Sequence, residues 1–236
     1  MPGPIKAVLV DVDGTLTEAR GSKLISLDAV AGVRLLERRG VVVVLVSGNS
    51  LPVTAGLAYY LGSSGPVIGE NGCVALYQGR VIHFCEGRPP ESLIKKIESL
   101  GFVESWQNQY RHHDLALLPR RGEKVDRRVL AEASRIVIES GYKPQWSGYA
   151  LHILPPHGGK SLGARKVAKL LGVGLSELGG VGDGENDIEM LEVVGFSAAP
   201  SDADERVKEV VDYVASKPGG AGFREIALKL LGLQAQ

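Results

Sequence analysis

The chain has 236 residues, 44% of them hydrophobic, and its 27 Lys and Arg side chains balance 27 Asp and Glu side chains. This composition is typical of a globular protein with a real core. The zero net charge argues against a dedicated nucleic-acid binder or a protein that docks on an anionic membrane. The first apolar run ends at Asp11, too early for a signal peptide or a membrane span, so we expect a cytoplasmic protein.

The first third of the sequence predicts a parallel sheet with helices between its strands. Apolar runs predict strands at 5–10, 41–46 and 67–68, and helices are predicted at 26–40 and 52–62. Strands that are apolar without alternation are typical of a parallel sheet that is buried on both faces. The β-α-β-α-β order then requires right-handed crossovers.

The pattern changes after residue 72 and returns near residue 160. Residues 73–77 and 80–84 flank Gln78 and Gly79, which predicts a hairpin. An α+β module then follows, with helices at 90–100 and 125–140 and strands at 113–118, near Trp146 and at 150–154. The first pattern resumes with a helix at 161–171, a strand near Val181, a helix at 188–194, a strand near Phe196 and two more helices. We therefore expect a discontinuous core, 1–79 and 158–236, with an inserted domain at 80–157.

The two cysteines, Cys73 and Cys85, are too few for a disulfide scaffold in a chain of this length. Cys73 lies in an apolar, strand-like run. The sequence therefore favours a buried free thiol at this position.

Four acidic residues follow predicted strands, where a parallel sheet binds its ligands. Asp11 and Asp13 come directly after the strand at 5–10, in DVDGT, and Asp183 and Asp187 follow a later strand, in GDGEND. Ligands of such sheets bind beyond the carboxyl ends of the strands, so these side chains should converge. Crowded carboxylates repel each other unless a cation lies between them, and all-oxygen ligands favour Mg²⁺ over zinc.

Two further motifs supply groups that bind phosphate. Ser47 follows the strand at 41–46, and its hydroxyl and the backbone amides of Gly48 and Asn49 can donate to phosphate oxygens. Lys160 carries a point charge suited to phosphate. Acids, magnesium, a lysine and a hydroxyl together indicate phosphoryl chemistry, with one acid free to attack phosphorus.

Each of these residues has a plainer interpretation on its own. An Asp before a helix is more often an N-cap than a metal ligand, and Asp183 fits that role. Lys160 alone is more often a solvated surface lysine, and Ser47 alone can be a turn residue. The N-cap interpretation leaves Asp11 unexplained, because its strand leads into a loop rather than into a capped helix.

Taken in chain order, these motifs resemble those of the haloacid-dehalogenase superfamily of phosphatases. DVDGT corresponds to the first motif, LVSGN to the second, Lys160 to the third and GDGEND to the fourth. The inserted module resembles the α+β cap, of the type called C2B, that is found in Cof-type sugar phosphatases. The resemblance implies a Rossmann-like α/β core with a parallel sheet and an inserted α+β cap.

The resemblance also implies a role for each motif residue. Asp11 would be the nucleophile that forms an aspartyl-phosphate, and Asp13 the general acid for the leaving oxygen and then the base for water. Ser47 and Lys160 would hold the phosphate together with Gly48 and Asn49. The residues implied to bind Mg²⁺ are Asp11, Asp13 through its backbone carbonyl, Asp183, and Asp187 either directly or through another ligand.

The short cap, the SGN sequence and the overall length are most similar to archaeal members that act on 2-phosphoglycolate. The expected reaction is therefore Mg²⁺-dependent hydrolysis of this small phosphomonoester to glycolate and phosphate. The second anionic group of that substrate needs a cation or amide donors on the cap side. The candidates are Arg111, His112, His113, Lys124 and His157.

Other functions stay open at this point. A sugar-phosphate phosphatase or a phosphomutase has a similar core and cap, and a mutase would release phosphate slowly because it must return its phosphoryl group. A signalling receiver module also uses Asp, Ser or Thr, Lys and Mg²⁺, and would stay phosphorylated without turnover. Asp13 and the inserted module argue against a receiver. The sequence leaves the assembly state open, a homodimer included.

Overall fold

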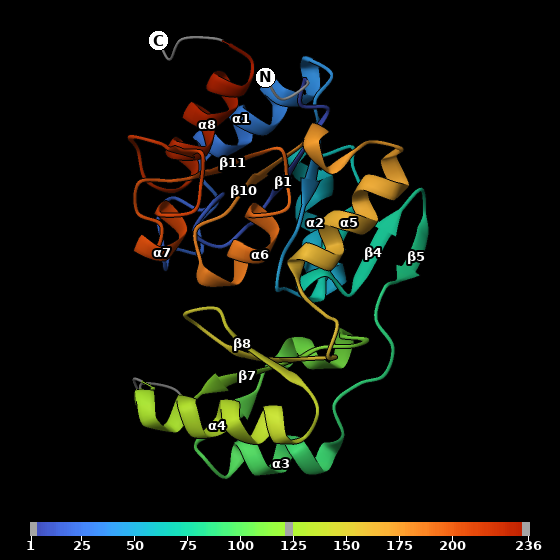
Figure 1. Ribbon diagram of the computed structural model, residues 1–236, viewed down its shortest axis with the longest axis vertical. Helices are drawn as coiled ribbons and strands as arrows, with labels where there is room; N and C mark the ends of the chain where they lie inside the picture. Colours follow the sequence, from blue (N-terminus) through green and yellow to red (C-terminus); the bar gives the residue numbers. More distant parts are fainter. Residues whose placement is uncertain (1–3, 121–124, 233–236) are drawn as a thin grey trace.

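The computed structural model describes residues 4–120 and 125–232, which form a larger α/β core and a smaller α+β cap (Figure 1). The core contains a five-stranded parallel sheet in which β1 lies between β10 and β2. This arrangement confirms the predicted fold class. In sheet order the strands are β12 (Tyr213–Val214), β11 (Phe196–Ala199), β10 (Leu178–Val181), β1 (Ala7–Val10) and β2 (Val42–Leu45).

Helices cover both faces of this sheet, because successive side chains of each strand point to opposite faces. Val8 and Val10 pack into one apolar cluster and Ala7 and Leu9 into another. The first cluster lies under α1 (Leu27–Arg38), α2 (Leu51–Leu61) and α8 (Gly219–Leu230). The second lies under α5 (Lys160–Leu171), α6 (Ile188–Leu191) and α7 (Glu205–Lys208).

The third predicted strand, β3 (Val67–Gly69), joins a different sheet from the one that we expected. Only one parallel bridge, between Val46 and Ile68, links it to the end of β2. β3 pairs antiparallel with β4 (Val74–Tyr77), which in turn pairs antiparallel with β5 (Arg80–His83). The predicted hairpin at residues 73–84 is confirmed. With β3 it forms a separate three-stranded sheet, so β3 is not a strand of the parallel sheet.

Cys73 and Cys85 form a disulfide across this hairpin, so the prediction of a free thiol was wrong. The hairpin explains the bond, because the carbonyl oxygen of Cys73 accepts hydrogen bonds from the backbone N–H groups of Phe84 and Cys85. The two Cα atoms therefore lie 4.9 Å apart, within the range that a disulfide requires. The number of cysteines and the apolar run around Cys73 do not reveal that the hairpin places the two residues side by side.

The cap is a four-stranded antiparallel sheet with two helices on one face, packed around its own apolar cluster. Figure 1 shows these helices on the side away from the core, so that the other face of the sheet is turned toward the core. We did not anticipate β6, β12 or the 3₁₀ turns. The cap consists of α3 (Glu91–Glu98), β6 (Phe102–Glu104), a 3₁₀ turn at Trp106–Tyr110, β7 (Leu115–Pro119), α4 (Arg127–Glu139), β8 (Lys143–Trp146) and β9 (Leu151–Leu154). Further 3₁₀ turns in the core are Glu70–Gly72, Leu175–Glu177 and Glu185–Asp187.

The chain passes between core and cap twice, once between β5 and α3 and once between β9 and α5 (Figure 1). We propose that 1–79 and 158–236 form the catalytic core and that 80–157 is the inserted domain. The first strand of the inserted segment, β5, remains hydrogen-bonded to β4 of the core. None of the helices in the described ranges is both long and apolar enough to cross a bilayer.

Candidate active site

Three buried carboxylates meet at the carboxyl ends of the two central strands. Asp11 follows β1, and Asp183 and Asp187 follow β10, its parallel neighbour. One oxygen of each carboxylate lies within 4.8 Å of the others, so the cluster could hold a metal ion. The strands deliver these groups because the Asp11 N–H continues the ladder and donates to the carbonyl of Val181.

Glycines allow the loops to approach this closely. Gly14, just after β1, has φ of +90°, and a Cβ at this position would lie 2.2 Å from Oδ2 of Asp183. Any side chain there would therefore displace the carboxylate. Asp187 is fixed by the backbone N–H groups of Asp183 and Gly184, which both donate to its Oδ2 at 3.0 Å.

Lys160, at the start of α5, is fully buried among these acids. Its Nζ donates to Oδ1 of Asp11 and to Oδ1 of Asp187, each at 2.5 Å. Burial alone would lower the pKa of Lys160, but the two carboxylates outweigh it and raise the pKa, so the ammonium stays charged. Lys160 is therefore not the solvated surface lysine of the plainer interpretation.

The acids carry more negative charge than their surroundings compensate. Burial raises the pKa of Asp11. The nearby charges of Asp187 and Asp183 raise this pKa further, whereas Lys160 lowers it. Burial and Asp187 likewise raise the pKa of Asp183 to about 7, although Arg20 and Lys160 act in the other direction. When ionised, the three carboxylates outnumber the two cations that contact them, Nζ of Lys160 and the guanidinium of Arg20, and Arg20 also pairs with Asp204. A divalent cation that prefers oxygen ligands fits this donor set and charge.

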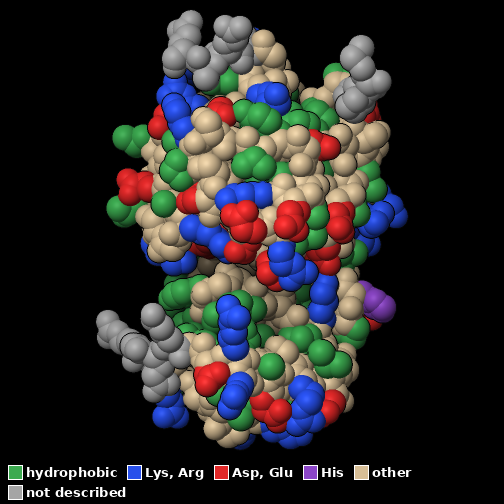
Figure 2. Space-filling model, turned by 60° about the vertical axis from the view of Figure 1, so that its left-hand side comes forward, with side chains coloured by type: hydrophobic (Ala, Val, Ile, Leu, Met, Phe, Trp, Pro, Cys, Tyr) green, Lys and Arg blue, Asp and Glu red, His purple; other side chains and the backbone are tan. Residues whose placement is uncertain are grey.

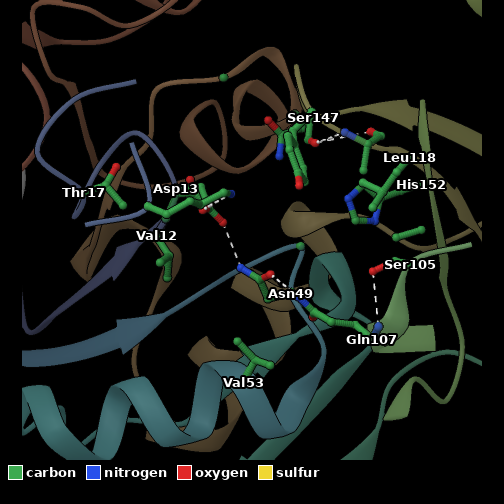
Figure 3. Close-up of a pocket in the computed structure, with 18 of the residues that line it drawn as sticks. Val12, Asp13, Thr17, Asn49, Val53, Ser105, Gln107, Leu118, Ser147 and His152 are labelled. Atoms are coloured by element: carbon green, nitrogen blue, oxygen red, sulfur yellow. Dashed lines mark hydrogen bonds and ion pairs between the residues drawn. The ribbon is translucent and has the colours of Figure 1, made fainter. Parts of the chain in front are cut away.

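Asp13 lies apart from the buried cluster, with 42% of its side chain exposed. Its Oδ1 accepts a hydrogen bond from Nζ of Lys23 at 2.8 Å, and its Oδ2 accepts one from Nδ2 of Asn49 at 2.8 Å. The second of these bonds is drawn in Figure 3. The Asp13 carboxylate is thus held at the surface of the site, where a substrate can reach it.

The loop after β2 places Ser47, Gly48 and Asn49 beside Asp13. Oγ of Ser47 accepts hydrogen bonds from the backbone N–H and from Nδ2 of Asn49, at 3.1 and 3.0 Å. The Ser47 hydroxyl proton therefore remains available for an anion. The carbonyl of Gly48 accepts a hydrogen bond from Nη2 of Arg111 at 2.8 Å, which ties the loop to the cap.

A cavity of about 490 Å³ separates the loops of the core from the cap. Figure 3 shows its wall, with Asp13 and Asn49 on the core side and Gln107 and His152 on the cap side. Asp11 and Asp183 also line it; Lys160, Ser47 and Asp187 do not, but Lys160 contacts Asp11 and Ser47 contacts Asn49. Figure 2 shows side chains of both charges on the core where it borders the cap.

Of the described cap candidates, only Arg111 lines this cavity. His113 contacts His83 instead, with 2.8 Å between His83 Nδ1 and His113 Nε2, and the ring of His112 also packs on His83. His157 is exposed and does not line the cavity. Lys124 lies outside the described residues.

Sequence reasoning missed a buried network that joins Arg111 to two other side chains. Nη1 of Arg111 donates to Oδ1 of Asp114, and Nδ1 of His152 donates to Oδ2 of Asp114 at 3.0 Å. Burial alone would raise the pKa of Asp114, but Arg111 and His152 outweigh it and hold that pKa below its usual value. The network links to the core through Asn71, whose Nδ2 donates to Asp114 Oδ2 at 3.0 Å.

Sequence reasoning also missed Lys23 and Gln107, which line the cavity from the loop after β1 and from the 3₁₀ turn of the cap. The only available signal for Lys23 was a cation shortly after DVDGT. Nothing in the sequence marked Gln107, because its role depends on where the cap lies over the core.

The fold and the acid cluster define a class, and comparison with known proteins agrees: the chain belongs to the haloacid dehalogenase-like hydrolases. The sequence profile of that family matches residues 8–108 and 128–223. The chain is also similar to a protein of Aeropyrum pernix that is named phosphoglycolate phosphatase. The two are 48% identical over 232 residues, which cover 98% of this chain and 96% of the relative.

Two solved structures share the fold. A crystal structure of a Thermoplasma acidophilum protein matches with a TM-score of 0.86 and 25% identity, over 97% of this chain and 99% of that one. A sugar phosphatase of haloacid-dehalogenase subclass IIB matches with a TM-score of 0.75 and 17% identity, over 96% and 99%. The second likeness shows the fold alone, and it confirms the type of cap that we expected.

Proposed function

We propose that this protein is a Mg²⁺-dependent phosphatase that hydrolyses 2-phosphoglycolate to glycolate and phosphate. The observation that carries the proposal is the contact between Lys160 and Asp11, at the edge of a cavity between the loops of the core and the cap. The name of the Aeropyrum pernix relative supports the choice of substrate.

Asp11 is the nucleophile in this proposal. Its Oδ1 accepts a hydrogen bond from Lys160, which leaves Oδ2 free to attack phosphorus. Attack forms the aspartyl-phosphate bond and breaks the bond from phosphorus to the ester oxygen. Water then attacks the aspartyl-phosphate, which releases phosphate and restores the Asp11 carboxylate.

Asp13 acts as the general acid in the first step and as the general base in the second. It donates a proton to the ester oxygen as that oxygen leaves, because an alkoxide is a poor leaving group. It then takes a proton from the attacking water and returns to its starting state. Its exposed carboxylate, held by Asn49 on one oxygen, suits a group that must meet both substrate and water.

The remaining residues hold the phosphate and the metal. Ser47, the backbone amides of Gly48 and Asn49, and Lys160 bind the phosphoryl oxygens. Mg²⁺, when bound, neutralises the crowded acids and polarises a phosphoryl oxygen. The residues that would hold it are Asp11, Asp13 through its backbone carbonyl, Asp183 and Asp187, the last either directly or through another ligand.

A panel of phosphomonoesters tests the proposal. Phosphate release should show the highest kcat/KM for 2-phosphoglycolate, above neutral hexose phosphates of similar reactivity. A sugar phosphate that outperforms it tenfold would exclude this substrate and leave a general phosphatase. Slow release of phosphate, with transfer of the phosphoryl group between positions of a sugar, would indicate a mutase. Stable phosphorylation of the protein without turnover would indicate a receiver module.

A further inference from the structure

We infer that Lys23 binds the carboxylate of the leaving group and thereby makes the enzyme select small phosphomonoesters that carry a second anion. The inference deepens the proposed function and rests on it. It assigns recognition to a loop of the core rather than to the cap, where the sequence had led us to look.

The loop after β1 fixes the position of Lys23. Thr17 and Ile25 form an antiparallel bridge, and the Glu18 N–H donates to the carbonyl of Leu24 at 2.9 Å. Oγ1 of Thr17 accepts a hydrogen bond from Gly14 N–H at 2.8 Å, which anchors this small hairpin on the end of β1. The backbone therefore holds Lys23 over Asp13.

Nζ of Lys23 lies where the leaving group must pass. It is 2.8 Å from Oδ1 of Asp13 and 4.5 Å from the ring centroid of Tyr149, which belongs to the cap. To receive a proton, the ester oxygen of the substrate must come within about 3 Å of the Asp13 carboxyl group. In phosphoglycolate, one methylene separates that oxygen from the carboxylate, which places the carboxylate within reach of Nζ.

Lys23 is also the cation that can change its partner. Among the described residues, Lys23 and Arg111 supply the Lys and Arg side chains of the 490 Å³ cavity. Both Nη groups of Arg111 are engaged, one by Asp114 and the other by the Gly48 carbonyl, and its Nε, which has no hydrogen-bond partner among the described residues, is buried. The ion pair of Lys23 with Asp13 is different, because its side chains are 59% and 42% exposed and water weakens such pairs.

A lysine suits this task because its ammonium is a compact point charge on a flexible stem. The substrate carboxylate attracts Nζ beside the ring of Tyr149 on the cap, and this attraction adds to the contacts that the phosphate makes. A leaving group without a carboxylate gains nothing from Lys23. Selection among small phosphomonoesters follows from that difference.

The test compares two substrates that differ in the second anion. We expect Lys23→Met to lower the ratio of kcat/KM for 2-phosphoglycolate to that for 2-hydroxyethyl phosphate by tenfold or more, mainly through KM for phosphoglycolate. Lys23→Arg should restore most of this ratio. Lys95→Met, which removes an exposed lysine of α3 that pairs with Glu91, is the matched control and should keep the wild-type ratio.

A binding measurement separates recognition from proton transfer. Calorimetry with Mg²⁺ present should show that Lys23→Met weakens binding of 3-phosphonopropionate tenfold or more, and binding of ethylphosphonate less than threefold. Neither phosphonate can be hydrolysed, so a defect in catalysis does not affect this result. Thermal unfolding of the variant checks that the fold is intact.

The possible failures are distinct. If wild-type enzyme prefers phosphoglycolate and Lys23→Met keeps that preference within twofold, the inference about Lys23 is overturned and the proposed function stands. If wild-type enzyme hydrolyses 2-hydroxyethyl phosphate as well as phosphoglycolate, the proposed substrate itself is wrong.

Discussion

Gln107 of the cap donates a hydrogen bond from Nε2 to Oδ1 of Asn49 at 2.9 Å. Its Oε1 accepts a second bond from the backbone N–H of Ser50 at 2.7 Å, so one amide of the cap holds the loop after β2 at two points. Asn49 in turn donates to Asp13 (Figure 3). The position of the Asp13 carboxylate therefore depends on where the cap lies.

Removal of this link should slow turnover. Gln107→Leu leaves Oδ1 of Asn49 and the Ser50 N–H without their partner, so Asn49 no longer holds Asp13 in a fixed position. We expect kcat to fall about tenfold, because small displacements of catalytic groups are costly. Gln109→Leu is the control in the same turn, since Gln109 is exposed and bonds only to the carbonyl of Trp106 among the described residues. Equal kcat in the two variants would contradict a link from Gln107 to Asp13.

Asp11→Asn tests covalent catalysis. The substitution keeps size and removes the attacking charge, so we expect turnover to fall by about 10³-fold or more while the fold survives. Rapid acid quench should trap phosphate on the wild-type chain and not on the variant. Asp28→Asn, at an exposed ion pair with Arg224, should behave as wild type. Hydrolysis of p-nitrophenyl phosphate by Asp11→Asn at near wild-type rate would exclude Asp11 as the nucleophile.

Metal removal should abolish activity and leave the fold intact. EDTA should stop turnover without changing the far-UV circular dichroism, and Mg²⁺ should restore it. Asp183→Ala removes one carboxylate of the cluster, so calorimetry should show weaker Mg²⁺ binding, and excess Mg²⁺ should restore activity only in part. Full activity in EDTA would exclude the metal mechanism.

The metal-free protein should lose stability as pH rises from about 4 to 7. The pKa of Asp183 is raised from 3.8 to about 7, mainly by burial and then by Asp187, so the folded state binds more protons than the unfolded chain in this window. Deprotonation therefore disfavours the folded state, and the free energy of unfolding should fall by a few kcal/mol. Thermal unfolding in EDTA from pH 4 to 7 measures this slope. Mg²⁺ should flatten it, and a metal-free protein that gains stability over this range would contradict the charge assignment.

Reduction of the disulfide should destabilise the protein without removing any residue of the candidate active site. Cys73 and Cys85 are 12 positions apart, and closing a loop of this size contributes about 3 kcal/mol in the chain-entropy account. We expect dithiothreitol to lower Tm by about 6–12 °C in a protein of this length. The double variant Cys73→Ser, Cys85→Ser should start at the lower Tm and not respond to dithiothreitol. Identical Tm values with and without reductant in the wild type would show that the bond contributes little.

The acid cluster could be predicted because a parallel sheet brings the carboxyl ends of its strands to one edge. Asp11, Asp183 and Lys160 each follow a recognisable strand or open a recognisable helix, so chain order and strand direction were enough to bring them together. The hairpin at Gln78 and Gly79 was predicted from the strand-like runs on either side of it, and in the structure both turn residues adopt positive φ.

The contacts across the cavity could not be predicted in this way. Gln107 and Arg111 reach the core only because the cap sheet faces it, and no periodicity in the sequence encodes that orientation. The prediction that β3 belongs to the parallel sheet was wrong because either edge of a short strand can pair. In the structure β3 pairs with the hairpin that follows it. The disulfide was missed because it depends on the register of the hairpin, which the sequence prediction did not include.

The active site is assembled from the two ends of the chain, and this has a consequence during synthesis. Oγ1 of Thr15 bonds to Asp183, 168 positions away, and Lys160 bonds to Asp11 across 149 positions. At about 5–20 residues per second, a ribosome needs roughly ten to thirty seconds to add the residues between Thr15 and Asp183. Until then one edge of β1 has no partner, and an open strand edge can pair with another chain. The cap is complete before β10 exists, so a nascent chain can fold its lid before it has the acids that would bind a metal.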